Sequence, residues 1–244
     1  MNVAYLKLTA VLLMLASVPA FAGQSVDESW DIDADAQVSI ENIAGEIVIQ
    51  GWDRNEARLT GELGDSVDEL EISASDSSLR INVANRNERN VDNTELKLMV
   101  PEGASIDADA VSADIDVSGL DNEKLTASSV SGNVDVSVSS RRISIESVSG
   151  DVGFSGHTVR ISAESVSGDI ELSGISGEVS ATTVSGDMEL QAGLIDSGKF
   201  ETVSGDMTVV AEISDNGKLT AESMSGDVTV LLPGSQRGMF KAQS

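Results

Sequence analysis

The chain has 244 residues, with 41 acidic and 15 basic side chains, so its formal net charge at pH 7 is −26. A surface this negative repels phosphate backbones and anionic headgroups, which argues against nucleic-acid binding and docking on anionic lipid and favours basic partners or divalent cations. The sequence contains no cysteine, so it can form neither a disulfide nor a thioether-linked lipid anchor.

The first residues have the pattern of a secretory signal. Lys7 precedes an apolar run from Leu8 to Leu15, and Ala20-Phe21-Ala22 has the small-x-small form that a signal peptidase accepts before Gly23. The run is short for a hydrocarbon core of about 30 Å, and no later stretch approaches that length. We therefore predict a signal peptide at residues 1–22 and an exported protein. The periplasm is the expected location, with secretion or the cell surface as alternatives.

Residues 23–103 form a first, less regular region. Val38 to Ile49 matches Ile143 to Phe154 position by position, with Glu46 in the place of Asp151, so this is a displaced copy of a later repeat. Alternating apolar residues predict three further strands, separated by a polar loop at 85–93 and followed by a turn at 101–103. The predicted strands are Leu70 to Ala74, Leu79 to Val83 and Leu96 to Val100. We expect this region to cap the array that follows.

Residues 104–244 repeat one motif of the form apolar, Ser, small, acid or amide, apolar. The copies begin at Val111, Val130, Val148, Val166, Val184, Val203 and Met224, in steps of 19, 18, 18, 18, 19 and 21 residues. A nearly constant period of this length is typical of a solenoid, in which each unit buries its apolar side only by stacking on its neighbours. The sequence therefore predicts an all-β, single-chain β-solenoid, a β-helix-like stack of two-strand coils of about 18 to 19 residues.

The order of side chains within one coil places the motif at a corner. Ile143, Ile145 and Ser147 share one parity, and Val148, Val152 and Phe154 share the other. We expect a strand through 143–146, a corner at 147–151 and a second strand from Val152, with both strands facing one core. Glycine suits such a corner because it can take a positive φ, and Asp151 can accept hydrogen bonds from turn amides.

Stacked coils would align the acids of the motif in a ladder at about 4.8 Å spacing. The members are Asp114, Asp151, Asp169, Asp187, Asp206 and Asp227. Like charges at this separation repel unless they are solvated, hydrogen-bonded or bridged by a cation. Solvated carboxylates that cap the turn are the main expectation. Calcium along the corner is the alternative, with Asp151, Asp169, Asp187, Asp206 and Asp227 as its candidate ligands, although the glycine-rich half of a calcium-roll repeat is missing and position 133 is Asn.

No residue stands out as catalytic. His157 is the only histidine, so neither a zinc site nor a Ser-His-Asp triad can be assembled. The repeated serines are better explained by structure than by catalysis, which needs one distinctive constellation. They are Ser131, Ser149, Ser167, Ser185, Ser204 and Ser225. Neighbouring acids, Asp31 with Asp33 and Asp114 with Asp116, leave a polysaccharide-active β-helix enzyme as a minor alternative, for which the mature chain offers few aromatic platforms.

Several segments together resemble one bacterial family. They are Ile43-Ala44-Gly45-Glu46-Ile47, Gly51-Trp52-Asp53, the run from Leu98 to Ala104, and the serial Val-Ser-Gly-Asp-Val units. The chain is similar to the putative-adhesin family of β-strand repeats, a domain of unknown function also called toast-rack. The resemblance implies a non-enzymatic extracytoplasmic scaffold that contacts a protein or cell-envelope component, in some members linked to envelope stress. It supplies no catalytic, cofactor or ligand residues.

The array ends on half a coil. Gly238 to Ser244 aligns with Gly217 to Ser223, and the chain stops where the next motif would begin. An open strand edge is a template for pairing with another chain, so we expect self-association or partner stacking at this edge. Light scattering with and without residues 235–244 tests that expectation, which a monodisperse monomer in both cases would contradict.

Overall fold

The computed structural model describes residues 14–19, 24–65, 67, 69–84, 92–232 and 239–243. Of the predicted signal peptide it therefore describes only Met14 to Pro19, and the rest lies outside the described residues, as does most of the predicted loop at 85–93. The described residues form strands and turns and no helix, so none of them forms a helix that could cross a bilayer.

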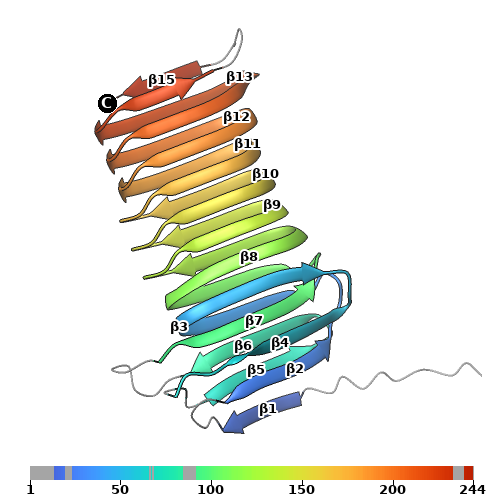
Figure 1. The fold of residues 1–244 in the computed structure, drawn as a ribbon. Helices are drawn as coiled ribbons and strands as arrows, with labels where there is room; N and C mark the ends of the chain where they lie inside the picture. The colour runs from blue at the N-terminus through green and yellow to red at the C-terminus, as the bar shows by residue number, and fades with distance from the viewer. Residues whose placement is uncertain are drawn as a thin grey trace, which may run out of the picture.

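All the strands belong to one 15-stranded sheet that winds into a stack, as Figure 1 shows along its length. In chain order they are β1 (Met14–Pro19), β2 (Ser25–Asp31), β3 (Gln37–Trp52), β4 (Glu56–Glu62), β5 (Glu69–Ser75), β6 (Ser78–Ala84), β7 (Thr94–Pro101), β8 (Ser105–Ser129), β9 (Val134–Ser147), β10 (Val152–Ser165), β11 (Ile170–Ser185), β12 (Met188–Ser204), β13 (Met207–Ser225), β14 (Val228–Leu231) and β15 (Met239–Gln243). The predicted β-solenoid is confirmed.

Each coil of the regular array has two strand-like halves that face one core. In β9 the side chains of Val134, Val136 and Val138 are buried after one corner, and those of Ile143 and Ile145 are buried before the next. The alternation shifts between the two halves, where two consecutive residues are exposed. The predicted coil of two strands is therefore confirmed.

Parallel pairing places like residues on top of one another. Val152 of β10 lies between Val134 of β9 and Ile170 of β11, and the column continues through Met188 and Met207. All five side chains are at least 99% buried. Each fully buried aliphatic side chain contributes about 1.5 to 3 kcal/mol, so the apolar columns hold the coils together along the stack.

The displaced copy lies in register with the regular array. Ile47 of β3 pairs with Ile115 of β8, and Glu46 lies beside Asp114. On its other side β3 pairs in parallel with β6 and β7, and antiparallel pairs β5–β6, β4–β7 and β2–β4 follow. The three strands predicted at 70–74, 79–83 and 96–100 are confirmed as β5, β6 and β7.

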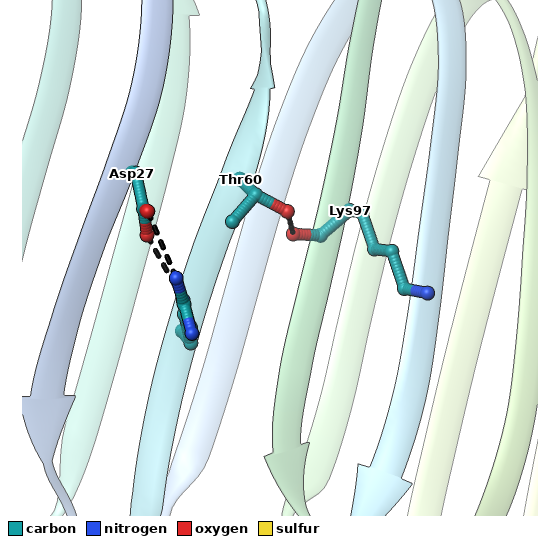
Figure 2. A network of polar contacts seen from close by, with 4 residues as sticks. Asp27, Thr60 and Lys97 are labelled. Carbon is teal, nitrogen blue, oxygen red and sulfur yellow. Dashed lines mark hydrogen bonds and ion pairs between the residues drawn. The ribbon is translucent and has the colours of Figure 1, made fainter.

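Polar contacts tie the antiparallel strands together at this end (Figure 2). The guanidinium of Arg58 in β4 donates to both carboxylate oxygens of Asp27 in β2, at 2.9 and 2.8 Å, and this pairing lowers the pKa of Asp27. Thr60 of β4 donates its hydroxyl to the carbonyl of Lys97 in β7 at 3.4 Å. Successive strands beyond β3 are thus linked by side chains as well as by the backbone.

At the other end, β14 and β15 both pair in parallel with β13. Lys218 lies beside Met239 and Ala221 beside Ala242, which is the alignment that the sequence predicts for the last half coil. Docking of another chain on this edge stays a prediction.

Candidate functional site

The repeated motif forms a sharp corner between successive strands, as predicted. β9 ends at Ser147 and β10 begins at Val152, and the pattern recurs down the stack. Ser149, Asp151 and the other exposed residues of each copy line one long edge of the solenoid. This edge carries the motif in coil after coil and is the candidate functional site.

A row of buried hydroxyl groups, and not the serine of the motif, joins a corner to the preceding coil at five positions, whereas Oγ1 of Thr202 in the same row has no hydrogen-bond partner in the described structure. Ser147 is 4% exposed, and its Oγ donates to the carbonyl of Gly132 in the preceding coil at 3.1 Å. Ser129, Ser165, Thr183 and Ser223 make the same contact at 2.9 to 3.4 Å. Sequence reasoning overlooked this row, although Ser147 shares the parity of buried Ile145. The serines that it did single out are exposed.

The glycine of the motif is required by a close approach between coils. The expectation of a positive φ at Gly150 is wrong: among the described glycines of this row, a positive φ occurs only at Gly45, Gly205 and Gly226. A Cβ at Gly150 would instead lie 2.1 Å from the carbonyl oxygen of Gly132, and one at Gly168 would lie 2.1 Å from that of Gly150. The corners therefore stack backbone on backbone, with no space for a side chain.

The aspartate row also links successive coils. Asp151 Oδ1 accepts a hydrogen bond from the backbone N–H of Asp169 at 2.9 Å. Five further side-chain oxygens accept the equivalent hydrogen bond from a backbone N–H of the next coil, at 2.7 to 3.0 Å, and they belong to Asp114, Asn133, Asp169, Asp187 and Asp206. The predicted acceptance of turn amides is confirmed, with the donor in the neighbouring coil. In five carboxylates one oxygen is therefore committed to the stack, namely in Asp114, Asp151, Asp169, Asp187 and Asp206.

No group of three or more acidic or histidine side chains in the described ranges is arranged to hold a metal ion. Calcium binding by Asp151, Asp169, Asp187, Asp206 and Asp227 stays a prediction, and in the first four of these residues it would have to use the second carboxylate oxygen. His157 is exposed in β10 and lies beside Ser139, so it does not join the motif serines at the corner. Asp114 and Asp116 both point to solvent.

The first residue of the motif lies outside the core, contrary to what the parity of Val148 with Val152 suggests. Val148 is 45% exposed because the alternation continues outward from buried Ser147 and is broken only within the turn that follows. The equivalent residues are 43 to 81% exposed and form what we call the valine stripe: Val111, Val130, Val148, Val166, Val184, Val203 and Met224. An apolar ladder therefore runs along the corner.

A second acidic cluster lies on the face that follows the corner. Asp116 of β8 is in register with Asp135 of β9, and Asp135 is in register with Gly153 of β10. A Cβ at Gly153 would lie 2.3 Å from Asp135 Oδ1, so the carboxylate leans across the glycine. Partial burial there raises the pKa of Asp135, and the charges of Asp116, Asp114 and Asp151 raise it further.

The raised pKa makes the ionised form of Asp135 unfavourable for folding. The penalty is fully present above the pKa of the folded state and absent below the unfolded value of about 3.8. We expect Asp135→Asn to melt at a higher temperature than the wild type at pH 7 and to lose this advantage by pH 3. Thermal unfolding followed by circular dichroism at both pH values measures it, with Asp53→Asn in an exposed turn as the control. An equal advantage at both pH values would contradict the electrostatic cause.

Comparison with known proteins supports the fold. The family profile described as Toastrack DUF4097 matches residues 28–244. A crystal structure of a putative lipid binding protein from Parabacteroides distasonis is similar with a TM-score of 0.52 and 14% identity, over 90% of this chain and 97% of that one. A putative adhesin from the same species has a TM-score of 0.50 and 11% identity, over 91% and 98% of the two chains. No curated protein matches the chain in sequence.

Proposed function

The chain belongs to the Toastrack DUF4097 family, and on this premise we propose that it is a non-enzymatic, extracytoplasmic scaffold whose corner surface binds a protein or another component of the cell envelope. The observation that carries the proposal is the division of roles among the residues of the motif. Its glycine and acid serve stacking in coil after coil, as does the hydroxyl row beside it, whereas its apolar residue faces solvent.

Export is part of the proposal and rests on the sequence of residues 1–22, with the periplasm as the expected location. A link to envelope stress is proposed from the family resemblance. Two solved structures of similar fold are described as a putative adhesin and a putative lipid binding protein. For this chain the net charge of −26 favours a protein or a cationic component over an anionic lipid surface.

A fractionation and binding experiment tests the proposal. We expect the full-length chain, expressed in the producing bacterium, to lose residues 1–22 and to be recovered outside the cytoplasm. The purified mature protein should then sediment with isolated envelopes in a saturable manner. Retention in the cytoplasm, or no saturable binding to envelopes, would overturn the proposal.

The same assay separates the scaffold from a calcium-dependent adhesin. Because one carboxylate oxygen in four of the five candidate ligands already accepts a backbone N–H, we expect equal envelope binding in EDTA and in calcium. Calorimetric titration of the mature protein with calcium should show no heat, and its melting temperature should not shift. Binding that requires calcium would favour the alternative.

A further inference from the structure

The valine stripe is a continuous apolar ladder on a strongly acidic protein. Its seven residues occupy consecutive coils at about 4.8 Å spacing, so the ladder is about 29 Å long. Between Val111 and Val203 the exposure of each side chain stays between 43 and 48%, so no coil interrupts it. Solvated apolar surface of this regularity on one edge needs an explanation that the internal packing does not supply.

Acidic residues flank the stripe on both sides. When Ile43 is counted as the equivalent residue of the displaced copy, the glutamate row lies two positions before the stripe, is interrupted by Ser128 and Thr182, and consists of Glu41, Asp109, Glu146, Glu164, Glu201 and Glu222. Three positions after it lies the aspartate row, which is interrupted by Asn133 and consists of Glu46, Asp114, Asp151, Asp169, Asp187, Asp206 and Asp227. Strand pairing keeps the rows in register, as Glu146 with Glu164 and Glu46 with Asp114 show.

In the central coils of the stripe, the flanking acids are available to pair with a basic group of a partner. Glu146 and Glu164 are exposed, and among the described residues neither forms an ion pair. Toward the C-terminal end Glu201 is paired with Lys199 at 2.7 Å. The coils of Val148 and Val166 therefore combine an apolar seam with unneutralised carboxylates on both sides.

The spacing of the coils favours a helical occupant. A helix advances about 5.4 Å per turn, so its apolar seam drifts against the 4.8 Å ladder by only about 0.6 Å per turn. In a strand lying along the stripe, residues on the same face recur about every 6.8 Å. They differ from the 4.8 Å ladder by about 2 Å per repeat and fall out of register after one or two coils. A helix of about 18 residues would match the stripe over three or four coils before the drift reaches half a spacing.

The charge of the rows decides between occupants. Anionic lipid and the acidic corner of a second copy are repelled. The basic corner of a second copy, where Lys124, Arg142 and Arg160 stack in register, is partly neutralised because Arg160 bonds Glu178 at 2.7 Å. A helix with an apolar seam and lysine or arginine on both sides satisfies both features of the surface.

We propose that the valine stripe and its two acidic rows form a docking site for a basic amphipathic α-helix of a partner protein. The proposal rests on the scaffold function above and names the partner chemistry of the same surface. In this proposal the carboxylates attract and orient the basic helix, and the valines become buried against its apolar seam.

A synthetic peptide tests the site. The probe is an 18-residue peptide with a leucine seam of helical periodicity and lysines on both flanks, and the matched peptide has glutamate in place of lysine. We expect the lysine peptide to bind the mature protein and to become helical. Circular dichroism near 222 nm reports on the peptide because the described part of the protein contains no helix. The glutamate peptide should not bind.

Protein variants locate the contact. Replacing Val148, Val166 and Val184 together by threonine keeps the β-branched shape and should weaken binding about tenfold or more. The control is Val159→Thr, a residue 46% exposed on the opposite side, which should leave affinity unchanged. Glu146→Gln with Glu164→Gln should weaken binding at 0.1 M salt and have little effect at 1 M, where the screening length falls from about 10 to about 3 Å. The control for charge is Glu171→Gln.

Three results would overturn the docking proposal: equal binding of both peptides, equal loss in the Val159 control, or tighter binding to vesicles of anionic lipid than to the lysine peptide. Light scattering of the wild type and the threonine variant tests the remaining occupant, since self-association lost in the variant would assign the stripe to a second copy. If the lysine peptide does not bind, but the wild type and the threonine variant bind envelopes equally, the docking proposal is refuted and the scaffold function stands. If the wild type binds no envelope, the scaffold function itself falls.

Discussion

Replacing Gly150 by alanine is expected to lower the free energy of unfolding by about 3 kcal/mol or more. The added Cβ would lie 2.1 Å from the carbonyl oxygen and 2.5 Å from the carbonyl carbon of Gly132, both of which are backbone atoms. The coils can make space only by separating at the corner. Separation weakens the backbone bond from Ser149 to Val130 at 3.0 Å and the side-chain bond from Ser165 to Gly150 at 3.3 Å.

Thermal and urea unfolding measure this effect. For a chain of this size, 3 kcal/mol corresponds to a fall in melting temperature of about 6 to 12 °C. The matched control is Gly193→Ala, whose Cβ would meet only the carbonyl oxygen of Ile175, at 3.6 Å, and whose backbone does not have a positive φ. It should change stability little. Ala113 occupies the same row at the first corner, but there the backbone below it, at Gly45, has a φ of +115°. Equal melting temperatures for both variants would refute the close-approach explanation.

The second large effect is expected at Phe200, a fully buried aromatic ring in a column of small residues. Its neighbours above and below are Ala181 and Ala221. Gly198 provides the space for the ring, because a Cβ there would lie 2.9 Å from Phe200 Cε2. The preceding coil has Val179 and Ala181 at the same two positions. Where one coil has Val179 and Ala181, the next therefore has Gly198, which has no side chain, and the large ring of Phe200.

This exchange predicts strong coupling between the two positions. Phe200→Ala should cost about 3 to 5 kcal/mol because it leaves a cavity, and Gly198→Val should cost about 1 to 3 kcal/mol because it overfills the core. The double variant recreates the pair found at Val179 and Ala181 and should be more stable than Phe200→Ala alone, so the two effects should not add. Urea unfolding of all four proteins measures the coupling. A double variant as unstable as the sum of the singles would contradict the compensation.

Much of the fold could be predicted because its signals are local. The period near 18 residues indicated the coil, and the alternation of Ile143 and Ile145 and of Val152 and Phe154 indicated the two halves that face the core. The alignment of Gly238 with Gly217 predicted the register of β15 on β13. These features follow from side-chain parity and repetition, which the chain carries in every coil.

The candidate site was predicted less well, because its chemistry lies between coils. The motif was correctly placed at a corner and its acids were expected to accept amide hydrogen bonds, but the donors belong to the next coil. The motif serine Ser149 is exposed, whereas the hydroxyl that bonds the preceding coil at Gly132 belongs to Ser147, which the motif does not include. Parity alone grouped Val148 with buried Val152. The side chain of Val148 is exposed instead, and the proposed docking surface depends on that exposure.

The sequence by itself determined the class of the protein: an all-β, acidic repeat array whose apolar columns stack at a constant period, since alternation and repetition are properties of the chain alone. Only the tertiary structure decided what each corner residue does. The need for Gly150 and the acceptance by Asp151 depend on how closely residues about 18 positions apart approach one another. The exposure of Val148 depends on how the backbone turns between two strands. These distances are set by the packing of whole coils, and no window of sequence shorter than two coils contains them.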